Sequence, residues 1–162
     1  MNQPAAVGFD LRDLLFEDIR GRRFVAQIRA HSGGVLSGIE ALEMASSDIG
    51  VALLQRLPEG APLHSNTIVA ELAGTPKQIA LCEESLIGLV AKCSGVATTA
   101  ARARRAAGRI RVVCGAWKKM PSDMRQSLRR AITAGGIPTR LVDGDFVYMD
   151  KNYVRMLGGL RE

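Results

Sequence analysis

Aromatic residues are rare in this sequence, which holds one Trp, two Tyr and four Phe among its 162 residues. Proteins that bind nucleic acid by base stacking present several aromatic side chains along a basic groove. The net charge of +6 would suit a nucleic-acid partner, but the lack of aromatics disfavours that function class. Small anionic molecules suit the same charge equally well.

Long hydrophobic runs are also missing. No apolar stretch approaches the roughly 20 residues that cross a bilayer, and residues 1–8 lack the cationic start and apolar stretch of a secretory signal. We therefore expect a cytoplasmic protein without a membrane partner. With 47% hydrophobic and 23% charged residues, the composition is that of a globular protein with an aliphatic core.

Disulfide and metal-ligand patterns are absent as well. The three cysteines, Cys82, Cys93 and Cys114, are odd in number and lie in apolar contexts, which is typical of reduced, buried thiols. His31 and His64 have no Cys, Asp or Glu partner at ligand spacing, so no metal site is predicted. No Walker loop, Gly-x-Gly-x-x-Gly or Gly-x-Ser-x-Gly sequence occurs, which disfavours the nucleotide-binding and hydrolase classes that use them.

Positive charge is concentrated in residues 102–140, where eleven of the 22 Lys and Arg residues accompany a single carboxylate, Asp123. Within this stretch, apolar residues 110–117 predict a buried strand, which is followed by Lys118 and Lys119 and then by a helix. Backbone N–H groups and ammonium charges converge at such a strand end, which is typical of an anion site. The alternative is that the arginines at the start of the stretch belong to a solvated helix face.

The first two thirds of the chain alternate helix and strand signals. The patterns predict a short amphipathic helix that caps the core edge, an antiparallel hairpin, a second helix, two strands and a long helix. The long helix has Thr75 as its N-cap and Pro76 in its first turn, and it is expected to break at Ser94 and Gly95. In chain order the predicted ranges are 10–19, 23–36, 39–45, 51–57, 67–72 and 75–107.

The last third predicts one parallel β-α-β unit, with a strand over residues 110–117, a helix over residues 123–134 and a strand over residues 145–149. A single unit of this kind leaves its strand edges open. We therefore expect the preceding sheet, another subunit or a partner to cover them.

A set of short motifs resembles quinolinate phosphoribosyltransferase, the nicotinate-nucleotide pyrophosphorylase family. Each motif alone is weak, but their order and approximate spacing along nearly the whole chain are those of the family. The motifs are Glu17-Asp-Ile19, Gly34-Val-Leu-Ser-Gly-Ile-Glu-Ala41, Asn66-Thr-Ile-Val-Ala-Glu71, Ser94-Gly-Val-Ala-Thr98, Lys118-Lys-Met-Pro121, Gly135-Gly136, Thr139-Arg-Leu141 and Phe146-Val-Tyr-Met-Asp-Lys-Asn152.

This resemblance implies an α+β fold, with an N-terminal α/β sandwich over residues 1–108 followed by a partial parallel β-α-β segment over residues 109–162, which is a truncated α/β barrel. It also implies a reaction. Family members join quinolinate to phosphoribosyl pyrophosphate with magnesium, releasing pyrophosphate and carbon dioxide on the way to NAD. They work as dimers in which the sandwich of one subunit covers the barrel mouth of the other. A cationic site suits this chemistry, because a dicarboxylate and a pyrophosphate must be held together.

Several positions depart from the family pattern, and the barrel strands that supply its metal-binding acids and phosphate loops have no counterpart here. Losing a charged partner to a bound carboxylate costs on the order of 2–5 kcal/mol, so the standard activity is expected to be lost in the chain alone. The family's Glu-Arg, Thr-Arg-Lys-Thr, His-Arg and Lys-Asp-Asn-His motifs are here Glu83-Glu84, Ala116-Trp117-Lys118-Lys119, Thr139-Arg140 and Asp150-Lys151-Asn152-Tyr153.

The resulting hypothesis is a diverged, shortened family member that binds a small anion of the pyridine carboxylate, phosphoribosyl or pyrophosphate type. The residues expected to hold the anion are Lys118, Lys119, Arg125, Arg140, Lys151 and Asn152. No cofactor is predicted, except Mg²⁺ if phosphoribosyl pyrophosphate is bound. A homodimer or hetero-oligomer is expected.

Two alternatives to this hypothesis stay open. The first is an active or repurposed phosphoribosyltransferase of NAD biosynthesis. The second is a nucleic-acid-binding protein. The sequence also leaves the roles of Glu84, Trp117 and Asp150 open.

Overall fold

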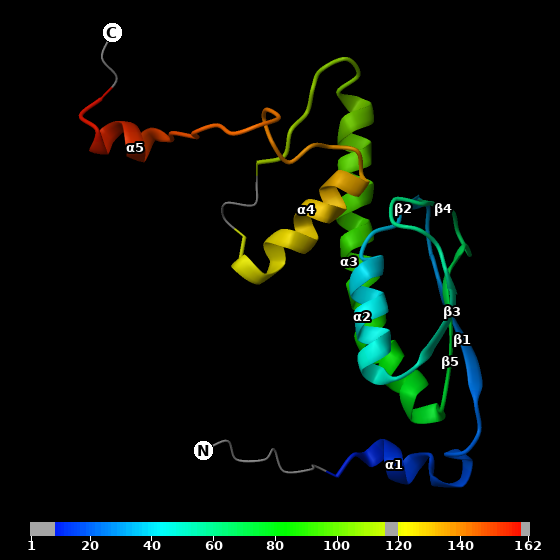
Figure 1. Cartoon of the computed structure of the whole chain (residues 1–162). Helices are drawn as coiled ribbons and strands as arrows, with labels where there is room; N and C mark the ends of the chain where they lie inside the picture. Colours follow the sequence, from blue (N-terminus) through cyan, green and yellow to red (C-terminus); the bar gives the residue numbers. More distant parts are fainter. Residues whose placement is uncertain (1–8, 116–119, 160–162) are drawn as a thin grey trace, which may run out of the picture.

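The computed structural model describes residues 9–115 and 120–159, so the predicted site residues Lys118 and Lys119 lie outside the described residues, as does Trp117. One layer of sheet and one layer of helices form the main body, and a shorter helical segment is attached to the far end of the longest helix (Figure 1). No helix in the described part of the chain is long and apolar enough to cross a membrane.

The main sheet has three antiparallel strands in the order β1-β5-β3. Both Ala26 of β1 and Leu53 of β3 lie opposite Leu72 of the central strand β5. Because β5 has a ladder partner on each side and a helix layer over one face, Leu72 is only 1% exposed. The strands are β1 (Phe24–Arg29), β3 (Ala52–Arg56) and β5 (Ile68–Gly74).

The hairpin predicted over residues 23–36 is wrong. β1 pairs with β5, whereas β2 (Gly34–Val35) pairs with β4 (Pro62–Leu63) in a separate two-stranded sheet. Alternation of apolar residues specifies a strand but not its neighbour. The chain after the turn instead contacts the helix layer, because the Val35 N–H donates a hydrogen bond to Thr98 Oγ1 at 2.9 Å.

Two helices, α2 (Ile39–Ile49) and α3 (Pro76–Ala106), cover one face of the main sheet (Figure 1). Their apolar faces meet the sheet through side chains such as Leu42 and Leu86, both 0% exposed. The predicted start of α3 is confirmed: Thr75 and Gln78 form a capping box, in which each side chain bonds the other's backbone N–H.

The break predicted at Ser94 and Gly95 is wrong, because α3 runs unbroken for 31 residues. An internal glycine costs a helix only about 1 kcal/mol relative to alanine. Packing outweighs this cost, since the Ser94 hydroxyl accepts a hydrogen bond from the Ser37 N–H at 3.0 Å and Ala97 is fully buried.

The N-terminal helix α1 (Leu11–Leu15) is shorter than predicted and is followed by the 3-10 turn η1 (Glu17–Ile19). It does not cap the core edge, because its leucines are all more than half exposed. Charged side chains hold it instead: Lys77 of α3 donates to both carboxylate oxygens of Asp13 at 2.7 Å. The polar side of α1 therefore lies toward α3, and its apolar side lies toward solvent.

The C-terminal segment contains η3 (Ser122–Met124), α4 (Arg125–Ala134) and α5 (Lys151–Met156). α4 packs on α3 through a small cluster in which Ala100, Ile132 and Ile137 are buried. Gly135 allows this close approach, since an added Cβ would lie 2.3 Å from the Ala97 carbonyl oxygen. The helix predicted over residues 123–134 is thus confirmed from Arg125 onward.

The two strands of the predicted β-α-β unit are not formed at residues 110–115 or 145–149. A backbone hydrogen bond joins the Cys114 N–H to the Pro138 carbonyl at 3.1 Å, but no ladder follows. Two strands without further neighbours are marginal in water. The predicted α+β class nevertheless holds, because strands β1 to β5 all lie in the first half of the chain, beside α2 and α3.

Candidate anion-binding site

The basic stretch forms the wall of an open cavity of about 850 Å³ beside α4. Its described lining combines three guanidinium groups with apolar and hydroxyl side chains and contains no carboxylate, which makes it positively charged. A volume of this size is typical of small-molecule sites. The lining residues are Val113, Gly115, Arg125, Arg129, Thr139, Arg140, Leu141, Phe146 and Tyr148.

α4 supplies two of the three cations. Arg125 and Arg129 are four residues apart, which places them one above the other on the same helix face. The Arg125 Nε donates to the Met120 carbonyl at 3.0 Å, which restrains that side chain at the start of the helix. On the α2 side, Arg130 forms an ion pair with Glu40. This pair and the buried cluster with α3 fix the direction of the arginine face.

Arg140 supplies the third cation from the loop after α4. Its guanidinium donates to the Gly144 carbonyl and lies 5.8 Å from the centroid of the Phe146 ring. The ring face attracts the cation, so the loop and the ring together orient Arg140 at the cavity. The site is solvent-exposed, and screening limits each exposed charge contact to about 0–1 kcal/mol.

The chemistry of these side chains suits an anion better than it suits acid-base catalysis. Three guanidinium groups without a lining carboxylate raise the local positive potential, which an anion relieves. The described lining has no histidine, carboxylate or cysteine that could move a proton, and only Tyr148 and Thr139 carry hydroxyls. It also lacks the carboxylate oxygens that hold Mg²⁺ in proteins, so these residues do not fit a metal held by the chain itself.

The structure brings together two of the six predicted site residues. Arg125 and Arg140 line the same cavity, whereas Lys151 and Asn152 lie exposed in the first turn of α5 and do not line it. The remaining two, Lys118 and Lys119, are outside the described residues.

Sequence reasoning missed Arg129, Phe146 and Tyr148 as site residues. The four-residue spacing of Arg125 and Arg129 on a helix would have indicated the first of them. The two aromatic residues belong to the motif of residues 146–152, but they were assigned to a strand and not to the site.

Two of the positions that depart from the family pattern have partners within the chain. Glu84 forms an ion pair with Arg12 of α1. Asp150 is the N-cap of α5, and its carboxylate accepts hydrogen bonds from the backbone N–H groups of Asn152 at 2.9 Å and Tyr153 at 3.3 Å. Both carboxylates thus serve the structure, one by holding α1 and the other by starting α5.

The ion pair of Glu84 is part of a charged cluster that joins α1 to the start of α3, and Lys77 is its second cation. The Arg12 backbone N–H, together with Lys77, holds the pKa of Asp10 below its ordinary value. Asp13 and Asp10 in turn raise the pKa of Lys77. We name Asp10, Arg12, Asp13, Lys77 and Glu84 the α1 charge cluster.

Comparison with known sequences gives a consistent family. The N-terminal domain of quinolinate phosphoribosyl transferase matches residues 12–94. A probable nicotinate-nucleotide pyrophosphorylase (carboxylating) from Methanothermobacter thermautotrophicus is 28% identical over 162 aligned positions, covering 93% of this chain and 57% of its own. The human nicotinate-nucleotide pyrophosphorylase is 30% identical, covering 85% of this chain and 47% of its own.

Solved structures show the same fold. NadC from Streptococcus pyogenes aligns with a TM-score of 0.71 at 22% identity, over 93% of this chain and 60% of its own. Nicotinate-nucleotide pyrophosphorylase from Pyrococcus furiosus aligns with a TM-score of 0.65 at 26% identity, over 91% of this chain and 37% of its own. The chain therefore spans about half the length of the curated relatives it matches.

Proposed function

The chain belongs to the quinolinate phosphoribosyltransferase family, and from that premise we propose that it is a diverged member that binds a small anion without catalysing the family reaction alone. The anion is of the pyridine carboxylate, phosphoribosyl or pyrophosphate type. The observation that carries this proposal is the cavity lined by Arg125, Arg129 and Arg140, whose described lining contains no carboxylate.

Loss of the standard activity is supported by what occupies the departing positions. The resemblance implies cations at these two positions, but Glu84 and Asp150 are carboxylates, held in an ion pair and a helix cap, and they would repel a substrate carboxylate. The described cavity lining also offers no group for general acid-base catalysis at neutral pH. These observations support binding without turnover by the chain alone.

A second subunit is part of the proposal. The cavity is open, and Val147 beside it is 86% exposed, with Tyr148 and Tyr153 also more than half exposed. Apolar groups exposed next to a binding site are typical of an interface. We propose that a second copy of the chain, or a related polypeptide, covers this surface and increases affinity by excluding water.

Thermal stabilisation tests the proposal. Pyrophosphate, phosphoribosyl pyrophosphate, quinolinate and nicotinate are each added to the purified chain, and at least one is expected to raise Tm with an affinity in about the millimolar range. Arg140→Gln should remove the shift. Arg111→Gln, which changes an exposed arginine of the same stretch that does not line the cavity, should keep it.

Two outcomes would overturn the proposal. If none of the four ligands shifts Tm, the cavity is not an anion site. If Arg111→Gln weakens the shift as much as Arg140→Gln, the effect is net charge and not the cavity. Release of pyrophosphate from phosphoribosyl pyrophosphate and quinolinate by the pure protein would instead show a working transferase.

A further inference from the structure

A small hollow of about 160 Å³ lies between the last turns of α3 and the loop that leads into β2, and it shares no lining residue with the cationic cavity. We name it the α3–loop pocket. Sites for drug-sized ligands measure roughly 300–1,000 Å³, so this pocket suits a small ion. Its lining consists of Gly33, Gly34, Val35, Thr98, Ala101, Arg102 and Arg105.

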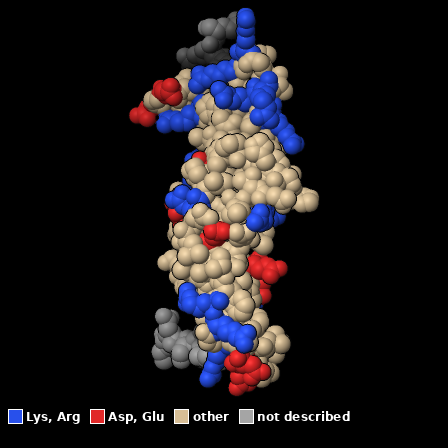
Figure 2. All heavy atoms as spheres, turned by 90° about the vertical axis from the view of Figure 1, so that its right-hand side faces the viewer, with Lys and Arg blue, Asp and Glu red and all other residues tan. Residues whose placement is uncertain are grey.

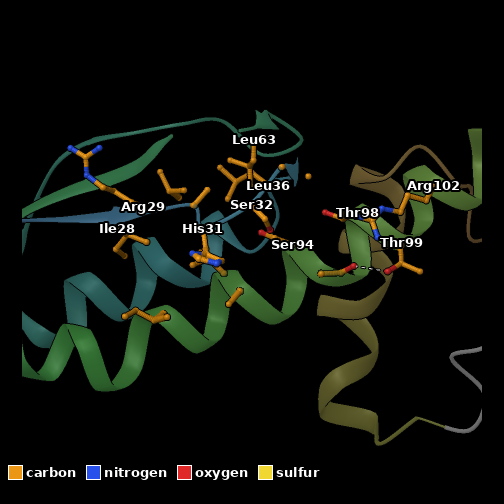
Figure 3. Close-up of a pocket in the computed structure, with 18 residues that line it drawn as sticks. Ile28, Arg29, His31, Ser32, Leu36, Leu63, Ser94, Thr98, Thr99 and Arg102 are labelled. Carbon is orange, nitrogen blue, oxygen red and sulfur yellow. Dashed lines mark hydrogen bonds between the residues drawn. The ribbon is translucent and has the colours of Figure 1, made fainter. Parts of the chain in front are cut away.

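The spacing of α3 places three polar side chains of the pocket in a row. Thr98, Arg102 and Arg105 are separated by four and then three residues, so each lies next to the following one on the same helix face. The Cβ atoms of such neighbours are about 5–6 Å apart. Figure 3 shows Arg102 beside Thr98. One small ion in the pocket is therefore within reach of two guanidinium groups and a hydroxyl.

These three side chains have donor groups that the rest of the chain does not use. The side chains of Arg102 and Arg105 make no hydrogen bond or ion pair within residues 9–115 and 120–159. The Thr98 hydroxyl accepts the Val35 N–H at 2.9 Å, but its own proton has no acceptor in the described part of the chain. Since a hydroxyl donates one bond in addition to those it accepts, the pocket offers donors of three side chains to a ligand.

The end of α3 does not need these arginines for its own carbonyl groups. Arginine side chains near a helix C-terminus often bond the last carbonyls. Here the backbone supplies the donors, because the Ala107 N–H bonds the Ala103 carbonyl at 3.0 Å and the Gly108 N–H bonds the Arg105 carbonyl at 3.3 Å. The guanidinium groups of Arg102 and Arg105 thus stay available to an anion.

The charge around the pocket favours an anion. No Asp or Glu is among its described lining residues. The two stretches of sequence that form it, residues 19–39 and 85–122, contain no acidic residue at all. Lys and Arg side chains gather at the upper end of the molecule in Figure 2, the end at which α3 terminates in Figure 1. Positive charge without nearby carboxylates raises the local concentration of anions.

The wall opposite the arginines is in place before any ligand binds. Gly34 lies so close to α3 that an added Cβ would be 2.3 Å from Thr98 Oγ1, and a Cβ on Gly33 would be 3.3 Å from the Leu63 carbonyl oxygen. The loop is therefore packed between α3 and β4, and the Val35 bond to Thr98 joins it to the helix. A wall fixed in this way needs little reorganisation on binding.

From these observations we propose that the α3–loop pocket binds a tetrahedral oxyanion of the phosphate type, either free phosphate or the phosphate group of a monoester. Arg102 and Arg105 donate charge-assisted hydrogen bonds to it, which are the stronger kind, and the Thr98 hydroxyl donates a further bond. The oxygens of a phosphate point in several directions, so donors from successive turns of a helix bind it together. Because the arginines are exposed, screening keeps the affinity in about the millimolar range.

Residue-resolved ¹H–¹⁵N NMR titrations of the full chain at constant ionic strength test the proposal. Orthophosphate and glycerol 3-phosphate are expected to shift the amides of residues 33–35 and 98–106 saturably. Acetate, a planar monoanion, is expected to bind there at least about threefold more weakly. Binding of both phosphates shows that the group is recognised in either source, whereas binding of orthophosphate alone assigns the pocket to the free ion.

Two substitutions and one control locate the binding. Arg102→Gln and Arg105→Gln should each weaken orthophosphate about three- to tenfold, because each removes one charged donor. The double variant should show no saturable shift. Arg109→Gln is the matched control, since it removes the same charge from an exposed arginine just beyond α3 that does not line the pocket, and it should leave the affinity unchanged.

Three results would overturn this proposal. The first is an absence of saturable shifts at residues 33–35 and 98–106 with orthophosphate. The second is acetate binding as strong as that of orthophosphate, and the third is equal weakening in Arg109→Gln, which would reflect net charge. Arg140→Gln should leave these shifts intact, so failure of the proposed anion cavity and failure of the α3–loop pocket give different results.

Discussion

Residues 9–108 and residues 109–115 and 120–159 carry similar apolar patterns but fold differently. In the first region the predicted strands over residues 51–57 and 67–72 become paired strands β3 and β5 under α2 and α3. In the second, residues 110–115 and 145–149 form no strand, and one backbone bond joins the former to the chain after α4. An apolar run therefore becomes a strand only where other strands of the same chain complete its ladder.

Charge differs between the two regions in the same way. In the sandwich, several cations have acidic partners, as in the α1 charge cluster and the Arg56–Glu43 pair. At the α4 cavity, three arginines line one hollow, and the described residues of its lining include no Asp or Glu. This difference agrees with the proposal that a ligand or a partner completes the second region.

The largest predicted effect distinguishes the core of the sandwich from the smaller cluster between α3 and α4. Leu86→Ala removes a fully buried side chain of the sandwich and should lower the free energy of unfolding by about 2–5 kcal/mol. Ile132→Ala lies in the smaller cluster between α3 and α4. It should release α4 and leave the sandwich folded.

Urea unfolding followed by circular dichroism, with amide exchange resolved by residue, measures both effects. Equal loss of amide protection throughout the chain in Ile132→Ala would contradict the separation of the two regions.

A smaller effect is expected at the contact that joins them. Gly135→Ala puts a Cβ 2.3 Å from the Ala97 carbonyl, so α4 must shift, at a cost of about 1–3 kcal/mol. Gly95→Ala on α3 meets nothing within 4 Å and should stabilise the helix by up to about 1 kcal/mol. Amide exchange in α4 and in α2 measures the effects of the two substitutions. Protection of the α4 amides that is unchanged in Gly135→Ala would contradict the close contact between α4 and α3.

The smallest effect concerns α1 and depends on pH. The pKa of Asp10 is lower in the folded protein than in the unfolded chain. The Asp10 carboxylate therefore helps to hold α1 at pH values above its unfolded pKa of 3.8, and this contribution is lost as the pH falls below 3.8 through the folded pKa. The pKa of Lys77 is higher in the folded protein than in the unfolded chain. The Lys77 ammonium therefore helps to hold α1 at pH values below its unfolded pKa of 10.5, and this contribution is lost as the pH rises above 10.5 through the folded pKa.

Leucine methyl resonances of α1 should therefore stay constant between these limits and move outside them. Glu84→Gln should loosen α1 within that plateau, because the residue pairs with Arg12. Glu83→Gln is the control, since Glu83 makes no ion pair in the described part of the chain. Methyl shifts that follow Glu83→Gln as strongly would argue against the α1 charge cluster.

Sequence patterns were sufficient where local chemistry determines the structure. Thr75 and Pro76 begin α3 as their cap chemistry requires, and Gly135 follows the last residue of α4. The family could also be recognised, because many weak motifs occur in the order that the family has. These features depend on a few neighbouring residues or on the sum of many positions.

Patterns failed where distant residues decide the outcome. The partner of β1 is β5, whose paired residues lie 39 to 50 positions further along the chain. The continuity of α3 at Ser94 depends on the contact of Ser94 with Ser37. The exposed leucines of α1 were assigned to the core because periodicity does not reveal that Arg12 and Lys77 hold the opposite side. Of the candidate site, Arg125 and Arg140 were found by charge, whereas Phe146 required the folded loop.

The most direct test of the account uses one sample and two readouts, ligand binding by calorimetry and pyrophosphate release, with phosphoribosyl pyrophosphate, quinolinate and magnesium present. We expect heat of binding that Arg140→Gln removes, and no pyrophosphate above the buffer control at stoichiometric enzyme. Pyrophosphate released in step with added protein, or no binding heat at all, would contradict the claim that this chain retains the family's cationic cavity without its reaction.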